Sequence, residues 1–83
     1  MSINQKIKII QIKFQSKNFE EVINGCEEIL KEEPNNVYVL NLCGLAFQNI
    51  NKIDLSVKFF ERAILIEKHN TSVMNNLANT YKG

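Results

Sequence analysis

The chain has 83 residues, with 10 Lys and Arg against 9 Asp and Glu, so its formal net charge is +1. This length allows one small domain, of marginal stability because a short chain buries a modest fraction of its surface. Charges of both signs are interspersed, so the sequence predicts no electrostatic attraction to nucleic acid or to an anionic membrane. The sequence shows neither a membrane-spanning apolar run nor a secretory signal pattern, so we expect a cytoplasmic protein.

Residues that carry chemistry are few. Cys26 and Cys43 with the single His69 are too small a set for a zinc site, so we expect no metal. The two cysteines fall on consecutive predicted helices, where buried small hydrophobes are the main interpretation and a redox link the alternative. No phosphate loop, nucleophile elbow or paired acid motif is present. We therefore expect neither an enzyme nor a bound cofactor.

The first two predicted elements differ in how clearly they are marked. From Ile3 to Phe14 the apolar spacing fits a helix, although Ile10, Ile12 and Phe14 also alternate as in a strand. The repeat described below favours the helix. From Phe19 onward a helix is clear, with Asn18 as its candidate cap and with apolar residues on one face: Phe19, Val22, Ile23, Cys26, Ile29 and Leu30.

Three further helices follow, each with apolar residues three or four positions apart. From Val37 to Ile50 the stripe is Val37, Leu40, Cys43 and Phe47. From Leu55 to Ile66 it is Leu55, Phe59, Ala63 and Ile66, widened by Phe60 and Ile64. From Val73 to Tyr81 it is Met74, Leu77, Ala78 and Tyr81.

The breaks between these helices carry start and stop signals. Pro34 disfavours helix at the residue before it, and Asn36 is placed to cap the next helix. A second break lies between Asn51 and Asp54, where Asp54 either caps the following helix or opposes its dipole. A third break covers residues 69–71.

The chain resembles itself at a spacing of about 34 residues. This shift places Asn36 on Asn70, and it places Cys26 on Phe60. The other matches are Leu40 on Met74, Gly44 on Ala78, Phe47 on Tyr81, Phe19 on Ile53, Val22 on Ser56 and Ile29 on Ala63. The matches share one register with the predicted breaks, which indicates a true repeat.

The repeat resembles the tetratricopeptide repeat family. The middle copy, residues 37–70, has Leu40, Cys43, Gly44, Phe47, Ser56, Phe60 and Ala63 at the family's signature positions, while Lys68 replaces the final proline. The first copy, 3–36, is degenerate but retains Val22, Cys26, Ile29 and Pro34. The third, 71–83, contains only its first helix. The resemblance implies an all-α fold of about five helices, in which antiparallel helix-turn-helix repeats stack as a short right-handed α-solenoid.

Small side chains give this resemblance a physical basis. A glycine such as Gly44 inside a helix costs about 1 kcal/mol relative to alanine, so its presence predicts close contact with another helix. Ser56, Ala63 and Ala78 serve the same need. Because one hairpin cannot bury its apolar face alone, neighbouring hairpins stack and leave a concave side.

The resemblance also implies a peptide or protein partner in that concave groove, on the first helix of each pair. The groove positions are then Tyr38, Asn41, Leu45, Gln48, Asn75, Asn76, Asn79 and Lys82. Asn76 and Asn79 resemble groove asparagines that hold an extended peptide by its backbone. A clamp for a terminal carboxylate is rejected, because Asn41 and Leu45 stand where it expects Lys and Asn. The alternative is that all these positions are merely solvated.

The third copy leaves one helix face open at Leu77, Ala78 and Tyr81. We expect self-association as a homodimer through this face. The alternative is that the chain is an oligomerisation or targeting segment, the N-terminal part of a larger repeat protein or of an enzyme such as a glycosyltransferase or sulfotransferase.

Overall fold

The computed structural model describes residues 1–82, which form five α-helices and no strand. The helices are α1 (Ile3–Gln15), α2 (Phe19–Glu32), α3 (Val37–Asn49), α4 (Ile53–Ile66) and α5 (Thr71–Lys82). The predicted all-α class is confirmed, and the first segment is helical rather than extended. Gly83, the last residue of the expected third copy, lies outside the described residues.

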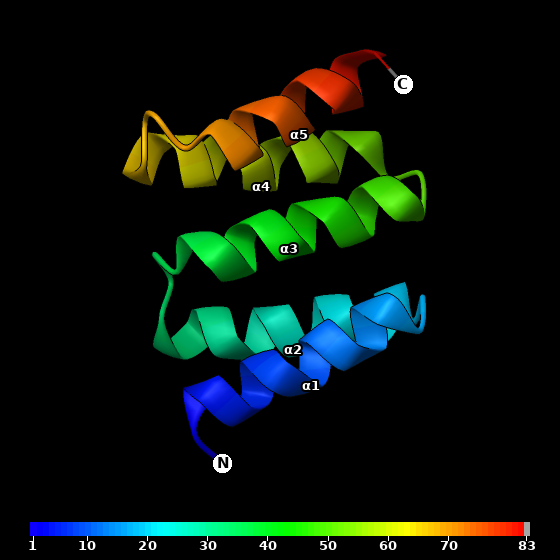
Figure 1. Cartoon of the computed structure of the whole chain (residues 1–83), viewed down its shortest axis with the longest axis vertical. Helices are drawn as coiled ribbons and strands as arrows, with labels where there is room; N and C mark the ends of the chain where they lie inside the picture. The colour runs from blue at the N-terminus through cyan, green and yellow to red at the C-terminus, as the bar shows by residue number, and fades with distance from the viewer. Residues whose placement is uncertain (83) are drawn as a thin grey trace.

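Each helix runs antiparallel to the one before it and packs against it, so the chain forms a pile of helical hairpins (Figure 1). The described residues span 36 × 25 × 17 Å, and the pile follows the longest axis. α3 lies in the middle and packs on both α2 and α4. It also contacts α5, so three other helices pack against it.

The backbone repeats with the same period as the sequence. The helices α1, α3 and α5 begin at equal intervals along the chain, and the starts of α2 and α4 differ by that same interval. The turns repeat too, because Lys17 and Asn51 are the two non-glycine residues with positive φ among those described, at 63° and 65°. Each reverses the chain after a helix, and a lysine in this conformation costs about 1 kcal/mol. One backbone geometry is therefore used twice.

The connections after α2 and α4 share a capping arrangement. The Asn36 Oδ1 accepts from the Val39 backbone N–H at 3.1 Å, and its Nδ2 donates to Glu33 at 2.9 Å. Asn70 makes the corresponding two bonds one repeat later. The predicted cap at Asn36 is confirmed. Satisfying a free N–H in this way stabilises a helix by about 1 kcal/mol.

One other cap prediction needs correction, and the two alternatives for Asp54 are decided in favour of the dipole. Asn18 is the N-cap residue of α2, but its side chain makes no capping hydrogen bond. The helix α4 begins after Lys52, and Asp54 lies inside its first turn. Asp54 therefore opposes the helix dipole rather than capping the helix.

The predicted apolar stripe of α4 was partly wrong. Its fully buried residues are Ser56, Phe60 and Ala63, whereas Leu55 is 39% exposed and Ile66 is 41% exposed. Leucine and isoleucine were assigned to the core because they are apolar. The side that faces α3 instead has small residues on either side of one aromatic ring, because the two helices lie close together.

The closest approach of these helices lies at Gly44. A Cβ atom at this position would lie 2.5 Å from Cε1 of the Phe60 ring, which is less than any ordinary contact. The Ser56 hydroxyl donates to the Gly44 carbonyl at 2.8 Å, so the buried oxygen has a partner. Gly25 has the same role in α2, because a Cβ there would overlap Cγ2 of Ile10. The close contact predicted from Gly44 is confirmed.

The variant Gly44→Ala tests this contact. Its extra methyl meets a ring that is fully buried and cannot move away, and such overpacking costs about 1–3 kcal/mol. Although alanine favours the helix, we expect the free energy of unfolding to fall by about 1 to 2 kcal/mol. Urea unfolding followed by helical circular dichroism measures it.

Asn24→Ala, at an exposed position of α2, is the matched control and should change the free energy of unfolding by less than about 0.5 kcal/mol. A Gly44→Ala variant as stable as the parent chain would contradict the close contact.

Candidate functional site

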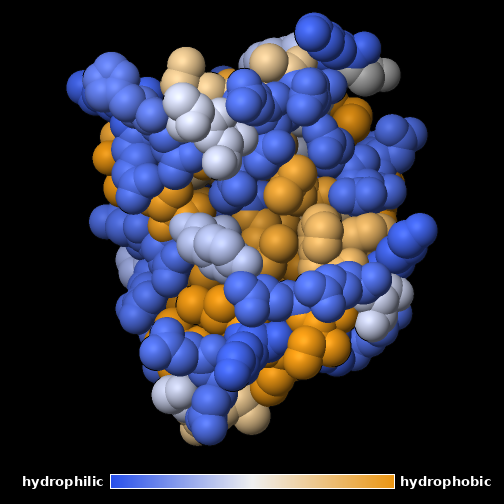
Figure 2. All heavy atoms as spheres, viewed as in Figure 1, coloured by the Kyte–Doolittle hydropathy of each residue, from blue (hydrophilic) through white to orange (hydrophobic). Residues whose placement is uncertain are grey.

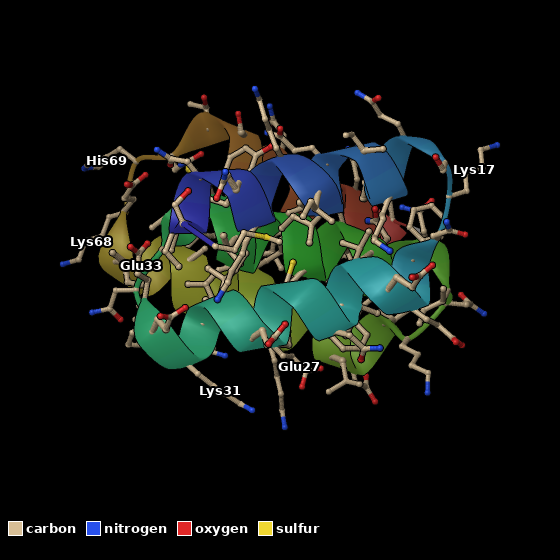
Figure 3. The ribbon with its side chains drawn as sticks, turned by 90° about the horizontal axis from the view of Figure 1, so that it is seen from below. Lys17, Glu27, Lys31, Glu33, Lys68 and His69 are labelled. Carbon is tan, nitrogen blue, oxygen red and sulfur yellow. The ribbon has the colours of Figure 1, made fainter. Side chains whose placement is uncertain are left out.

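One side of the pile is formed by α1, α3 and α5, and we name it the α1–α3–α5 face. Figure 2 views this side and shows apolar atoms gathered in a hollow at its middle, rimmed by hydrophilic residues. Seen from below in Figure 3, α1 and α5 occupy one side, while Glu27 and Lys31 of α2 point away from the other. His69 lies in an exposed turn at the rim.

The eight predicted groove residues divide by burial. Asn41, Leu45, Gln48 and Asn76 are half-buried. Tyr38 is 48% exposed, and the remaining three are exposed: Asn75, Asn79 and Lys82. Asn41, Gln48 and Asn76 line the contact between α3 and α5, whereas the exposed residues meet solvent.

Hydrogen bonds join the three helices across this face. The Nε2 of Gln11 on α1 donates to the Tyr38 hydroxyl on α3 at 2.6 Å. The Nδ2 of Asn76 on α5 donates to the Asn41 Oδ1 on α3 at 3.0 Å. The predicted residues Asn41 and Asn76 are therefore brought together.

A third bond fixes α5 nearer its C-terminal end. The Gln48 Nε2 donates to the Thr80 hydroxyl at 2.7 Å, and that hydroxyl donates to the Asn76 carbonyl at 2.8 Å. Thr80 is only 3% exposed, so its hydroxyl needs these partners. One short chain of bonds thus holds α3 and α5 in register near the C-terminal ends of both helices.

Gln11 and Thr80 are residues that the sequence prediction missed. Thr80 occupies the repeat position of Ala46, which is fully buried. A hydroxyl at a buried repeat position requires a hydrogen-bond partner. The alignment of Thr80 with Ala46 in the repeat therefore predicts such a bond from the sequence alone. Gln11 occupies the repeat position of Leu45, but it lies in the degenerate first copy, where no groove residue was assigned.

The face retains capacity for a ligand. A side-chain amide carries two N–H donors and an oxygen with two acceptor sites. The bond between Asn41 and Asn76 uses one donor and one acceptor site, so each amide can still pair with another group. Asn79 is exposed one turn further along α5. Asn76 and Asn79, one helical turn apart, therefore present amide donors and acceptors along one side of α5.

The face is nearly uncharged. α3 contains no charged side chain, and Lys82 is the only one in α5. On α1, Lys8 is exposed one turn before Gln11. Lys6 pairs with Glu32 at 3.0 Å, and this hydrogen bond raises the pKa of Lys6. Lys13 pairs with Glu21 at 2.6 Å. A charged ligand would therefore find few counter-charges here, which again speaks against a carboxylate clamp.

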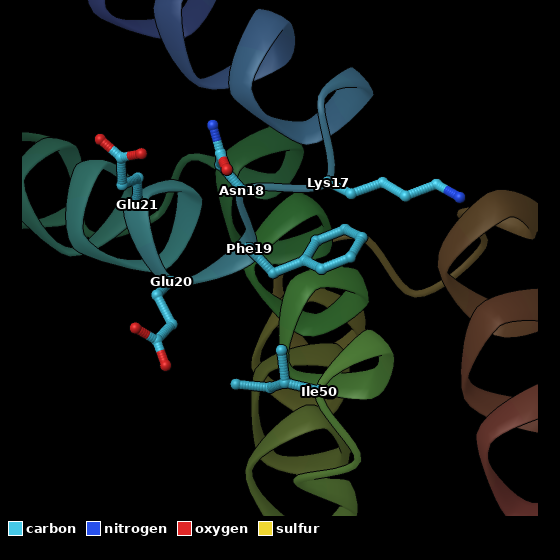
Figure 4. A pocket seen from close by; sticks show the side chains of 6 residues that line it. All are labelled: Lys17, Asn18, Phe19, Glu20, Glu21 and Ile50. Atoms are coloured by element: carbon cyan, nitrogen blue, oxygen red, sulfur yellow. The ribbon is translucent and has the colours of Figure 1, made fainter.

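A different hollow lies where two hairpin turns meet (Figure 4). It has a volume of about 310 Å³ and is lined by Lys17, Asn18, Phe19, Glu20, Glu21 and Ile50. The Phe19 and Ile50 side chains approach one another, while Lys17 and Glu20 point to opposite sides. Its charged side chains do not point toward a common position, so this hollow does not resemble a catalytic site.

The residues predicted for self-association border a second hollow beside α5. Leu77 is half-buried, Ala78 is exposed and Tyr81 is 66% exposed. Ile64 and Lys68 from the end of α4 and the following turn complete this hollow. The three predicted residues do share one open apolar surface.

The two cysteines lie together in the core. Cys26 and Cys43 are free thiols with no exposed surface. The hydrogen bond that the Cys43 thiol makes to the Cys26 sulfur, together with burial, raises the pKa of Cys43 well above its ordinary range. A thiol held neutral in this way is a poor nucleophile. This arrangement agrees with two buried hydrophobes.

Residues 1–82 hold no group of three or more His, Cys, Asp or Glu side chains that could bind a metal. Among the helices of the same residues, none is long and apolar enough to cross a membrane.

No protein-family model and no curated protein matches this chain.

The raised pKa of Cys43 predicts a pH dependence of stability. Well below the ordinary value of 9.0 the thiol is neutral in both states, so stability is unaffected. At higher pH the thiol ionises in the unfolded chain and stays protonated in the folded one. The free energy of unfolding should then fall by up to about 1.4 kcal/mol per pH unit.

Urea unfolding between about pH 8 and pH 10 measures this slope. Cys43→Ala is the control, and it should show a shallower decline over the same range. An identical slope in both chains would contradict the prediction.

Proposed function

We propose that this chain is a scaffold of the tetratricopeptide kind that binds an extended segment of a partner protein on its α1–α3–α5 face. The observation that carries the proposal is the Asn41–Asn76 pair, which places two side-chain amides at the centre of this face. We assign the chain no reaction of its own and expect it to act in the cytoplasm.

The repeat supports the first part of this proposal. Helix starts, positive-φ turns and asparagine caps all recur with one period of about 34 residues, which is the length of a tetratricopeptide unit. The glycine and small residues at the contact between α3 and α4 match the positions that carried the resemblance. Stacked hairpins of this type present a concave surface built from the first helix of each pair.

The chemistry of the face supports an extended peptide as the ligand. Amide side chains pair with peptide N–H and C=O groups without reading the sequence of the ligand. The face is nearly uncharged, so the ligand's backbone contributes more to recognition than charged side chains do. Leu45 is apolar and half-buried, so it offers a contact for one apolar side chain of the ligand.

The size of the face limits the ligand's length. Packed helices lie about 8–10 Å apart, so three neighbouring first helices extend over about 20 Å. An extended chain rises about 3.3 Å per residue, so about six residues span the face. A ligand of this length makes few hydrogen bonds, and we expect modest affinity.

The variant Asn76→Ala, Asn79→Ala tests the proposal. Both amides face the ligand, and each lost hydrogen bond weakens binding by about 1 kcal/mol, so affinity should fall about tenfold or more. Peptides selected from a random library on the immobilised chain provide the ligand, and fluorescence anisotropy measures the affinity.

Asn24→Ala on α2 is the matched control, because it removes the same amide from a helix outside the face. Circular dichroism verifies that the double variant stays folded. Equal affinity of the double variant and the parent chain would exclude these two asparagines from the binding site.

Backbone recognition makes a separate prediction. Methylating one central peptide nitrogen of a selected ligand removes an N–H donor and leaves the side chains in place. We expect at least one methylated position to weaken binding about fivefold or more, because its hydrogen bond is lost. If every methylated peptide bound as the parent peptide does, the ligand would be recognised through its side chains alone.

A further inference from the structure

A groove lies between α2 and α4, on the side of the pile toward which the labelled α2 side chains point in Figure 3, and we name it the α2–α4 groove. Each of these two helices packs on α3 and hardly on the other, so α3 forms the floor. Leu30 of α2 lies on one wall, Leu55 and Phe59 of α4 lie on the other, and Phe47 of α3 lies between them. The groove has a volume of about 510 Å³.

The α4 wall is an apolar stripe that α3 leaves uncovered. Leu55, Phe59, Arg62 and Ile66 follow one another at intervals of three or four residues, so they share one side of the helix. Leu55 and Ile66 are exposed and Phe59 is half-buried, whereas the residues of α4 that pack on α3 are fully buried. An apolar surface of this kind marks an interaction site in many proteins.

Arg62 lies within this stripe and is the only arginine of the chain. Its Cζ is 5.1 Å from the centroid of the Phe59 ring, and that ring stacks on Phe47 with 5.4 Å between centroids. A guanidinium carries its N–H donors at the edge of its plane, so contact with a ring through its face leaves them available. Among residues 1–82, Arg62 forms no ion pair.

Two other charged side chains line the groove, both on α2. Lys31 is a second cation, and Glu27, one turn earlier, is the only acidic side chain in the lining. The two cations outnumber this acid, and the α4 residues of the lining include no acid. A carboxylate of the occupant therefore fits at Arg62, where a bidentate ion pair can form.

The lining favours a helix over an extended chain. An extended segment has free backbone N–H and C=O groups that need partners, and the lining contains no amide or hydroxyl side chain. A helix satisfies its own backbone groups, so it can place apolar side chains in the groove without burying unpaired groups. α2 and α4 have 14 residues each, and a helix of that length is about 21 Å long, comparable with the 25 Å width of the pile.

We propose that the α2–α4 groove binds an amphipathic helix of a partner protein, which places aliphatic side chains on Leu55 and Phe59 and a carboxylate on Arg62. Arginine and aromatic residues are the types that contribute most to the energy of protein interfaces. This ligand differs from the extended segment proposed for the α1–α3–α5 face, and the two surfaces share no lining residue. Both ligands therefore bind at the same time.

Selection of helical peptides on the immobilised chain tests the proposal. The library contains stapled helices of about 14 residues with a leucine stripe, and the positions beside that stripe vary among glutamate, lysine and glutamine. We expect selected helices to bind with a dissociation constant of about 10–100 µM and to contain glutamate beside the stripe. In NMR spectra of the labelled chain, the amide signals of Leu55 and Arg62 should shift, while those of Asn76 and Asn79 should not.

Leu55→Gln tests the apolar part of the site. It should weaken binding of a selected helix about fivefold or more, because one buried aliphatic contact is lost. Leu65→Gln is the matched control, since Leu65 lies on the same helix, is 76% exposed and does not line the groove. This control should leave the affinity unchanged.

A charge exchange tests the ion pair. Arg62→Glu should weaken binding of a glutamate-bearing helix about tenfold or more, because two carboxylates then repel each other. Replacing that glutamate of the helix by arginine should restore binding to the variant, which also shows that the variant is folded. Lys58→Glu is the matched control, because it reverses a charge at an exposed position of α4 outside the lining, and it should change the affinity less than about twofold.

Three results would overturn the proposal. One is a library from which no helix binds the parent chain at up to about 500 µM. Another is a selected helix whose affinity is the same for Leu55→Gln, Arg62→Glu and the parent chain, which would place its site elsewhere. The third is equal selection of glutamate and lysine beside the leucine stripe, which would exclude the carboxylate at Arg62. None of these results bears on the extended ligand of the α1–α3–α5 face.

Discussion

The contact between Gly44 and Phe60 sets the distance between α3 and α4, and the rest of the structure depends on that distance. The absence of a side chain at position 44 lets the ring lie on the helix backbone, and Ser56 fixes the register through the Gly44 carbonyl. α3 is thereby buried on several sides, since it also packs against α2 and α5. α3 is therefore the central helix, against which the neighbouring hairpins pack.

Because α3 is enclosed, few of its polar side chains remain for binding. Asn41 and Gln48 reach the α1–α3–α5 face only beside α5, where Asn76 and Thr80 pair with them. Thr80 is buried, and its hydroxyl would cost about 1–3 kcal/mol without a partner. The same residues that hold α5 in place therefore form the proposed binding site, so a ligand there would also stabilise the fold.

α5 presents two different surfaces. Asn76 and Asn79 belong to the α1–α3–α5 face, whereas Leu77, Ala78 and Tyr81 border the apolar hollow beside the end of α4. The polar and the apolar side of this helix therefore share no residue.

The sequence by itself determined the helices, the period of the repeat and the cap at Asn36, because these depend on local spacing and on side chains that bond their own backbone. It also indicated a close contact at Gly44. Only the tertiary structure decided that Phe60 rather than Leu55 faces α3, and that Thr80 joins Gln48. These outcomes depend on how two helices distant in sequence fit together, and apolar spacing within one helix cannot distinguish between its two neighbouring sides.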